Sequence, residues 1–238
     1  MSTTKRIGMI VPSLNTIGED DLRRFCPQGV AYHVHRIRLR KEGGVVTPES
    51  LLRAYLEAVD EAGYLKDFGP DMITFNCTGA SVAYGPQGDA ALAERMQQVL
   101  GVASSNTMLA IKRALAQVGA RRIVHVCPFA DRFSSGEKAA LEAAGLDVIR
   151  SVGLNFIDAR EAARMDPQTL ADHALAHADP GMDALLLSCA NVRAFEAVEP
   201  LEQRLGVPVI TSNQAVLWDA LQQIGWQGRV AGGGRLLL

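Results

Sequence analysis

The segment Met72-Ile-Thr-Phe-Asn-Cys77-Thr-Gly-Ala-Ser81 returns later in the chain as Ala184-Leu-Leu-Leu-Ser-Cys189-Ala-Asn-Val-Arg193. In both copies a short apolar run, typical of a buried strand, leads to a cysteine that small or polar residues follow. One repeated segment alone could arise because buried strands have similar sequences. Two further pairs of similar segments, in the same order along the chain, support an internal repeat.

The first of these echoes pairs Arg6-Ile-Gly-Met-Ile-Val-Pro12 with Arg122-Ile-Val-His-Val-Cys-Pro128. The second pairs Gly101-Val102, followed by Ser105-Asn106, with Gly206-Val207, followed by Ser212-Asn213. All of them recur at nearly the same offset. We therefore expect two similar Rossmann-like α/β half-domains, related by a pseudo-twofold axis, with the active site in the cleft between them.

Strand and helix patterns alternate along the whole chain, which predicts βα units and parallel sheets. The predicted strands are Ile7–Val11, Ala31–Ile37, Met72–Phe75, Ile123–Cys127, Val148–Val152, Ala184–Leu187 and Val209–Ile210. The predicted helices are Glu49–Ala62, Asp89–Leu100, Met108–Val118, Glu137–Ala144, Gln168–Ala176, Phe195–Leu205 and Gln214–Ile224. Thr47 before Pro48 is typical of a helix N-cap, as are Asn106 and Asn213.

We divide the chain into an N-terminal α/β half-domain at 1–118, a C-terminal α/β half-domain at 119–225 and a tail at 226–238. An exchange of a strand between the halves stays open. The glycines of the tail, at 232–234, suggest a flexible end. Gly43-Gly44 suggests a loop, either a solvated connector or a cover over the cleft.

Composition excludes several classes of protein. Among 238 residues, 24 are Lys or Arg and 26 are Asp or Glu, so the formal net charge is −2. Without a basic excess, binding to nucleic acid is disfavoured. No apolar run approaches the ~20 residues that span a bilayer, and no secretory signal precedes the first strand. We expect a cytoplasmic protein with no membrane contact, and the sequence leaves open whether it forms a homo-oligomer.

The four cysteines are too widely spaced for a disulfide framework, and no C-x-x-C pair suggests a metal site. Cys77 and Cys189 end predicted strands, where ligands of open α/β sheets bind. Backbone N–H groups of the following residues (Thr78, Gly79 and Ala80 after Cys77; Ala190 and Asn191 after Cys189) could bind an anion. These groups should also lower the pKa of the two thiols. Cys127 and Cys26 are interpreted as structural.

Two thiols that face each other across a cleft suit racemisation or cis–trans isomerisation, because each can act on one face of a substrate. No histidine is placed to activate either of them, since His33, His35 and His125 fall in strand patterns and His173 and His177 on a surface helix. A Cys-His hydrolase is therefore the poorer interpretation.

The chain resembles the Asp/Glu racemase superfamily, in its branch of maleate cis–trans isomerases and arylmalonate decarboxylases. The resemblance covers nearly the whole chain. It rests on four stretches: Gly8-Met-Ile-Val-Pro-Ser-Leu-Asn-Thr16, Phe75-Asn-Cys-Thr-Gly-Ala-Ser81, Leu186-Leu-Ser-Cys-Ala-Asn-Val-Arg193 and Val207-Pro-Val-Ile-Thr-Ser-Asn-Gln-Ala215. The decarboxylases of this branch have glycine in place of the first cysteine. Both cysteines are present here, which favours an isomerase or a racemase.

The resemblance implies a mechanism without a cofactor or metal. Cys77 would add as a thiolate to an alkene carbon of maleate, the C–C bond would rotate, and Cys189 would supply and then remove a proton at the neighbouring carbon. Elimination would give fumarate. The substrate carboxylates would be held by Asn15 and by the backbone after each cysteine. The residues expected around the substrate are Ser13, Asn15, Thr78, Gly79, Phe129, Ala190 and Asn191.

Two departures from the isomerase pattern concern this carboxylate binding. Phe129 stands where the isomerases have a tyrosine whose hydroxyl donates to the substrate. Their asparagine near 155–160 has Asn155 or Asp158 as its counterpart here. A lost hydrogen bond to a charged group costs about 1.5–3 kcal/mol. The substrate is therefore a small carboxylate or dicarboxylate, and it need not be maleate.

Three alternatives stay open. A decarboxylase acting on a malonate-type diacid would need only Cys189, to protonate an enediolate. Amino-acid or hydantoin racemases of the same superfamily use two thiols. In a different class, a non-catalytic protein that binds small molecules would suit the two-half cleft, although both thiols would then be superfluous.

Overall fold

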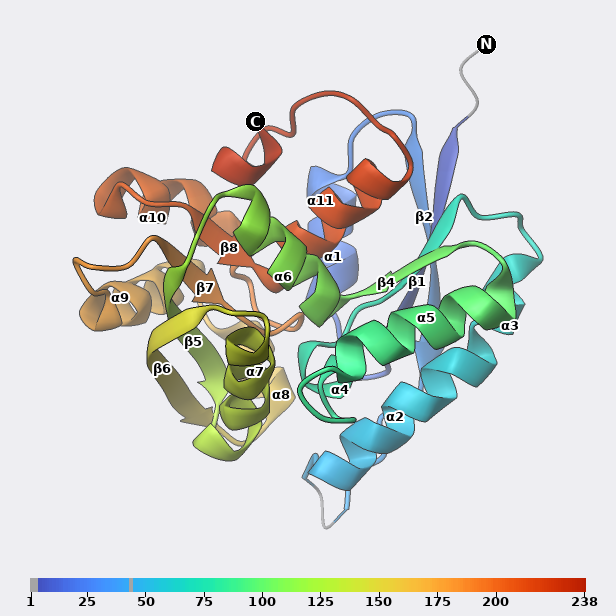
Figure 1. Cartoon of the computed structure of the whole chain (residues 1–238), viewed down its shortest axis with the longest axis horizontal. Coiled ribbons are helices and arrows are strands. Elements are labelled where there is room, and N and C mark those ends of the chain that lie inside the picture. The colour runs from blue at the N-terminus through green and yellow to red at the C-terminus, as the bar shows by residue number, and fades with distance from the viewer. Residues whose placement is uncertain (1–3, 43–44) are drawn as a thin grey trace.

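The structure is a computed structural model that describes residues 4–42 and 45–238, and of residues 131 and 132 the backbone alone. Two four-stranded parallel sheets organise the chain (Figure 1). The first consists of β1 (Lys5–Pro12), β2 (Val30–Ile37), β3 (Met72–Phe75) and β4 (Ala103–Asn106), in the order β2-β1-β3-β4. The second consists of β5 (Arg122–Phe129), β6 (Asp147–Phe156), β7 (Ala184–Leu187) and β8 (Val209–Thr211), in the order β6-β5-β7-β8.

The two sheets repeat one topology, because β1 to β4 correspond in order to β5 to β8. Their registers agree as well: Ile7 lies opposite Met72 in the first sheet, and Ile123 lies opposite Ala184 in the second. This confirms the predicted fold class of two α/β halves with parallel sheets. It also places Cys77 and Cys189 two residues after the ends of the equivalent central strands β3 and β7.

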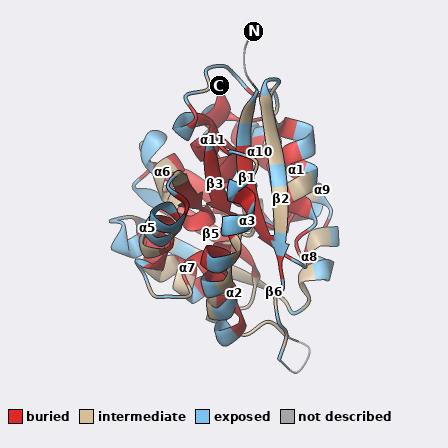
Figure 2. Cartoon of the chain, turned by 90° about the vertical axis from the view of Figure 1, so that its right-hand side faces the viewer, coloured by how far each residue is buried: buried red, intermediate tan, exposed pale blue. Residues whose placement is uncertain are grey.

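Helices cover the sheets on both sides, and the central strands β1, β3 and β5 are buried beneath them (Figure 2). In the first half the helices are α1 (Ile17–Phe25), α2 (Pro48–Glu61), α3 (Gly63–Lys66), α4 (Thr78–Ser81), α5 (Gly88–Leu100) and α6 (Thr107–Gln117). In the second half they are α7 (Asp131–Ala143), α8 (Ala159–Arg164), α9 (Pro167–His177), α10 (Val198–Leu205) and α11 (Ser212–Gln223). Short 3₁₀ turns lie at Phe195–Ala197 and Arg235–Leu237.

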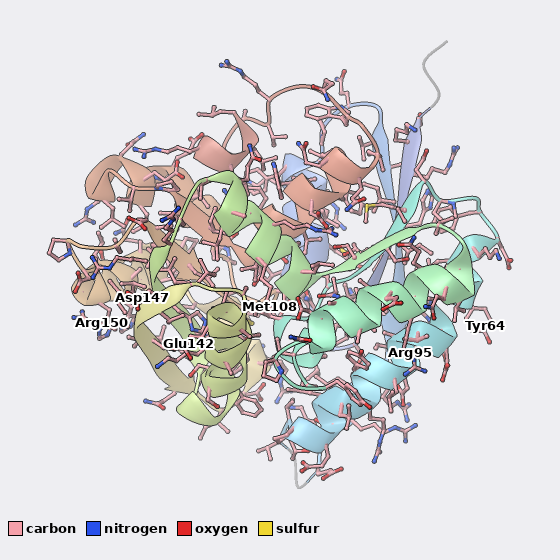
Figure 3. All side chains as sticks on the ribbon, in the orientation of Figure 1. Tyr64, Arg95, Met108, Glu142, Asp147 and Arg150 are labelled. Atoms are coloured by element: carbon pink, nitrogen blue, oxygen red, sulfur yellow. The ribbon has the colours of Figure 1, made fainter. Side chains whose placement is uncertain are left out.

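The two halves share a hydrophobic core. Helices α6 and α11 pack against each other across the pseudo-twofold axis (Figure 1). Met108 of α6, fully buried, lies in this region, whereas the labelled exposed side chains Tyr64, Arg95, Glu142, Asp147 and Arg150 lie on the outside of the halves (Figure 3). Phe25 of α1 stacks on Phe195 with ring centroids 3.8 Å apart. Among the described residues, no helix is long and apolar enough to cross a bilayer.

Several predicted elements need correction. Strand β4 was not predicted, because Ser104 and Ser105 make it too polar for a strand pattern although both are buried. Helix α1 was not predicted, because its apolar residues are few. Helix α7 starts six residues earlier than expected, at Asp131, and the predicted helix Phe195–Leu205 begins with a 3₁₀ turn.

The helix caps were predicted in part. The side chains of Thr47 and Asn106 each cap a helix, the first with Pro48 in the first turn. The cap of α11, in contrast, is Thr211, so the prediction for Asn213 is wrong. The tail is also not a loose end: Leu236 and Leu237 are buried, and Gln214 donates to the carbonyl of Gly233. Gly43-Gly44 lies outside the described residues.

Candidate active site

Both cysteines line one cavity of about 120 Å³ between the two halves, beyond the carboxyl ends of β3 and β7. This is where parallel α/β sheets bind ligands, because successive loops diverge there. Most of the wall is apolar, formed by Pro12, Leu14, Leu39, Val46, Leu51, Phe129, Phe133, Phe156 and Ile157. Polar groups come from Asn15, Asn76, Thr78, Glu137 and Asn191. The structure thus brings the two thiols to a common substrate-sized space.

Cys77 precedes the short helix α4, whose first N–H groups have no acceptor within the helix. The N–H of Ala80 donates to its thiol and lowers the pKa, but burial has the larger effect. Burial and the negative charge of Glu137 together raise the pKa of Cys77 to about 12. The expectation of a lowered pKa is therefore wrong for the ligand-free protein, since desolvation disfavours the charged thiolate.

Cys189 has a left-handed backbone, with φ of 103°, which is rare for a residue other than glycine. Two hydrogen bonds hold this conformation: its N–H donates to Ser212 Oγ at 2.9 Å, and its sulfur accepts from the N–H of Asn191 at 3.3 Å. Burial again outweighs the donor and raises the pKa of this thiol above its ordinary value. Strained backbone of this kind concentrates at functional sites, where the surroundings over-determine it.

The hydroxyl of Ser212 also contacts Thr78 Oγ1 at 3.0 Å. Since Thr78 follows Cys77, this one side chain links the segments that carry the two thiols. Ser212 is fully buried at the start of α11. In the sequence, Ser212 belongs to the repeated pair Ser212-Asn213, and no role was predicted for Ser212.

Asn15 and Asn191 join the two halves at the wall of the cavity. Asn15 Nδ2 donates to the carbonyl of Ala190 at 3.0 Å, and its Oδ1 accepts from Gly18 N at 2.8 Å. Asn191 Oδ1 accepts from the N–H of Thr16 at 3.0 Å. An amide nitrogen carries two hydrogens, so Asn15 keeps one donor for a substrate.

The other predicted substrate residues divide into two groups. Thr78, Gly79, Phe129 and Ala190 line the cavity, as do Asn15 and Asn191. Ser13 is absent from the described lining; its hydroxyl instead accepts from the N–H of Leu39. Neither Asn155 nor Asp158 belongs to that lining, and Asp158 caps α8 and pairs with Arg160.

A buried pair that sequence analysis did not find lies beside the cavity. Glu137 of α7 lines the wall, and His125 Nε2 lies 3.1 Å from its Oε2. His125 also contacts Ser188 Oγ at 2.8 Å and Ser151 Oγ at 3.0 Å. Glu137 was predicted only as the start of a helix, so its position towards the cavity had no signal in the pattern. Within the described part of the chain, no group of His, Cys, Asp and Glu is arranged to hold a metal ion.

Two parallel α/β halves of one topology, each with a cysteine after its third strand, form the architecture of the Asp/Glu racemase superfamily. A family model described as arylmalonate decarboxylase matches residues 7–237, and the chain belongs to this family.

The individual relatives are named for two different activities. An arylmalonate decarboxylase of Bordetella bronchiseptica is 31% identical, over 98% of this chain and 93% of the relative. A maleate isomerase of Geobacillus stearothermophilus is 26% identical, over 98% and 96%. A crystallised mutant of the Nocardia farcinica maleate cis-trans isomerase, described as holding a covalently bound succinylcysteine intermediate, superposes with a TM-score of 0.88 at 24% identity, covering 98% of each chain.

Proposed function

We propose that the chain is a cofactor-independent isomerase of a small carboxylate that uses Cys77 and Cys189, most like the maleate cis–trans isomerases. The observation that carries this proposal is the cavity lined by both thiols at equivalent strand ends. Decarboxylation needs a single proton donor, Cys189, and would give Cys77 no catalytic role.

In this mechanism the Cys77 thiolate attacks one alkene carbon, and a sulfur–carbon bond forms. Cys189 delivers its proton to the neighbouring carbon, so the former double bond becomes a single bond that can rotate. Return of that proton to Cys189 expels the Cys77 thiolate and restores the double bond with the other geometry. The succinylcysteine described for the Nocardia farcinica enzyme is the adduct that this sequence of steps would form.

The mechanism requires Cys77 as a thiolate, whereas the ligand-free protein favours the protonated thiol. Since burial raises the pKa of Cys77 to about 12, the resting group is the thiol, and the attack requires that its proton pass to a base such as a carboxylate of the entering substrate. Charge that develops on the substrate carboxylate can be stabilised by fixed donors, which is commonly the largest catalytic effect. The N–H groups of Thr78 and Gly79 and the free hydrogen of Asn15 are the donors available at this wall.

Two variants test the proposal. Cys77→Ser should abolish isomerisation, because a hydroxyl of far higher pKa cannot add to the alkene. Cys189→Ser should also lose turnover but should accumulate an adduct on Cys77, detected by intact-protein mass spectrometry after incubation with maleate. Cys26→Ser is the matched control and should behave like the wild type. Full turnover in both motif variants would refute the two-thiol mechanism.

A second candidate is decarboxylation of a malonate-type diacid, favoured by the 31% identical relative. In that case Cys77→Ser would retain activity and only Cys189→Ser would lose it. Proton NMR in deuterated water with maleate, an arylmalonate and single amino-acid enantiomers separates isomerase, decarboxylase and racemase, because each gives a different product or exchange pattern.

A further inference from the structure

The cavity wall combines chemically different groups. The two cysteines line it together with Thr78 and Gly79, whose backbone N–H groups follow Cys77 and can donate to an anion. Phe129, Phe133 and Phe156 contribute apolar rings to the wall. Among the side chains that the structure describes, no Lys, Arg or His lines the cavity. A carboxylate far from the backbone donors would therefore meet no positive charge from these described side chains.

Glu137 adds a negative group to this wall. The residue is 3% exposed, and its described hydrogen-bond partner, His125, is fully buried. His125 contacts one oxygen, Oε2, whereas a carboxylate can accept about four hydrogen bonds. The Glu137 carboxylate can therefore accept further hydrogen bonds from a ligand. It has no hydrogen to donate, so it cannot bind a ligand carboxylate, which also only accepts.

The position of Glu137 is fixed by three elements. It lies on α7, its partner His125 lies on β5, and His125 in turn contacts Ser151 on β6 and Ser188 beside Cys189. A carboxyl held in this way cannot swing aside at low cost when an anion approaches. Its charge also acts on both thiols, raising the pKa of each, which places it within electrostatic reach of the reacting atoms.

We infer that Glu137 is a specificity-determining residue, selecting substrates with one carboxylate and, at the other end, an N–H donor such as a primary amide, over dicarboxylates. This inference rests on the proposed function for the identity of the reacting end. The physical basis is that a buried like-charge contact is strongly unfavourable, whereas a donor completes the acceptor capacity of the carboxyl.

Binding is tested first with saturated analogues, which cannot react: succinate, succinamate and monomethyl succinate, titrated by calorimetry. Monomethyl succinate has lost one carboxylate charge without gaining an N–H donor, whereas succinamate has lost the charge and gained the donor, so the ester separates the two effects. In the wild type, succinamate should bind at least tenfold more tightly than succinate, with the ester between them. Equal affinities for succinate and succinamate, or no binding by any of the three, would overturn the inference.

Glu137→Gln should bring the affinities for succinate and succinamate to within about threefold, chiefly by tightening succinate. Glu137→Asp retains the charge and should retain the order of preference, which guards against a general packing effect. Glu61→Gln is the matched control, because His35 Nε2 lies 3.1 Å from Glu61 Oε2 in a pair outside the cavity lining. An unchanged preference in a folded Glu137→Gln protein would contradict the inference.

Turnover gives the second measurement. The ratio of kcat/KM for maleamate to that for maleate should exceed ten in the wild type and fall in Glu137→Gln. If Cys77→Ser still converts these substrates while the binding preference persists, the two-thiol mechanism fails and the role of Glu137 stands. If the cysteine variants behave as expected while the preference is absent, only the role of Glu137 fails.

Discussion

The hydroxyl of Ser212 accepts the backbone N–H of Cys189 at 2.9 Å and thereby holds this residue at φ of 103°. The same hydroxyl lies 3.0 Å from Thr78 Oγ1, next to Cys77. One side chain at the start of α11 therefore ties both thiol segments to a common point. The relative position of the two sulfurs depends on this link.

Ser212→Ala should lower kcat by about tenfold or more and change KM little, because the loss falls on positioning of Cys189 and not on the substrate contacts. A net hydrogen bond contributes about 0.5–1.5 kcal/mol, and the strained conformation adds to its effect. Steady-state kinetics measure the split. Ser212→Thr keeps the hydroxyl and should restore most of the rate; an equal loss in both variants would indicate a packing defect instead.

The rates of alkylation should distinguish the cysteines, and Cys77 should not be the most reactive, although its position before backbone N–H groups predicted a lowered pKa. Burial raises the pKa of Cys26 to about 11 and that of Cys77 to about 12. Both thiols are partly exposed, but Cys26 has the lower pKa, so iodoacetamide should label it before Cys77 in the ligand-free protein, and the fully buried Cys127 should be inert.

Peptide mapping across pH 7 to 10 measures these rates. Labelling of Cys77 should rise tenfold per pH unit, without a plateau, since the thiolate fraction is the reactive species. A plateau near pH 8 would show that its pKa lies below the ordinary value of 9.0. In that case the backbone donors would outweigh burial.

Much of the fold follows from pattern, because buried parallel strands require apolar runs and helices on their faces require amphipathic spacing. The runs before Cys77 and Cys189 therefore located the central strands β3 and β7 at their observed bounds. Strand β4 was not predicted, because Ser104 and Ser105 are buried through contacts that no local sequence pattern encodes.

The site was predictable only where the chain repeats itself. The repeat led to the cysteines and to the residues directly after them, which line the cavity. The pair of His125 and Glu137 joins a strand to a helix in another layer, so it depends on packing. The pKa of a thiol likewise depends on how deeply the folded chain buries it, and short sequence motifs do not carry that information.

Asp21 should make stability depend on pH. Burial raises its pKa from the ordinary 3.8 to about 7, although Asn213, which donates to it, acts in the opposite direction. Between about pH 4 and pH 7 the unfolded chain loses this proton and the folded chain keeps it. The free energy of unfolding should therefore fall as pH rises through this window and stay level above it.

Asp21→Asn should remove this fall, which amounts to at most about 4 kcal/mol. Urea unfolding at pH 4.5, 6 and 8 measures it. Asp20→Asn changes the exposed neighbour on the same helix, whose charge contributes less to the shift than burial does, and should leave most of the slope in place. An identical slope in the wild type and Asp21→Asn would assign the dependence to other groups.

Phe129→Tyr should improve the binding of dicarboxylates. Phe129 lines the cavity beside Phe133, with ring centroids 6.0 Å apart, and it brings no polar atom to the apolar wall. A tyrosine hydroxyl there would supply a donor to an anionic group, worth about 1.5–3 kcal/mol if the bond forms. The dissociation constant of succinate, measured by calorimetry, should fall at least tenfold. Phe133→Tyr adds the same hydroxyl to the neighbouring ring and should give a smaller gain, because the resemblance to the maleate isomerases implies a tyrosine donor at position 129 and not at position 133. Combined with Glu137→Gln, the two effects on the affinity for succinate should add if the two side chains contact the second carboxylate independently. An unchanged affinity in Phe129→Tyr would mean that the second carboxylate does not reach this ring.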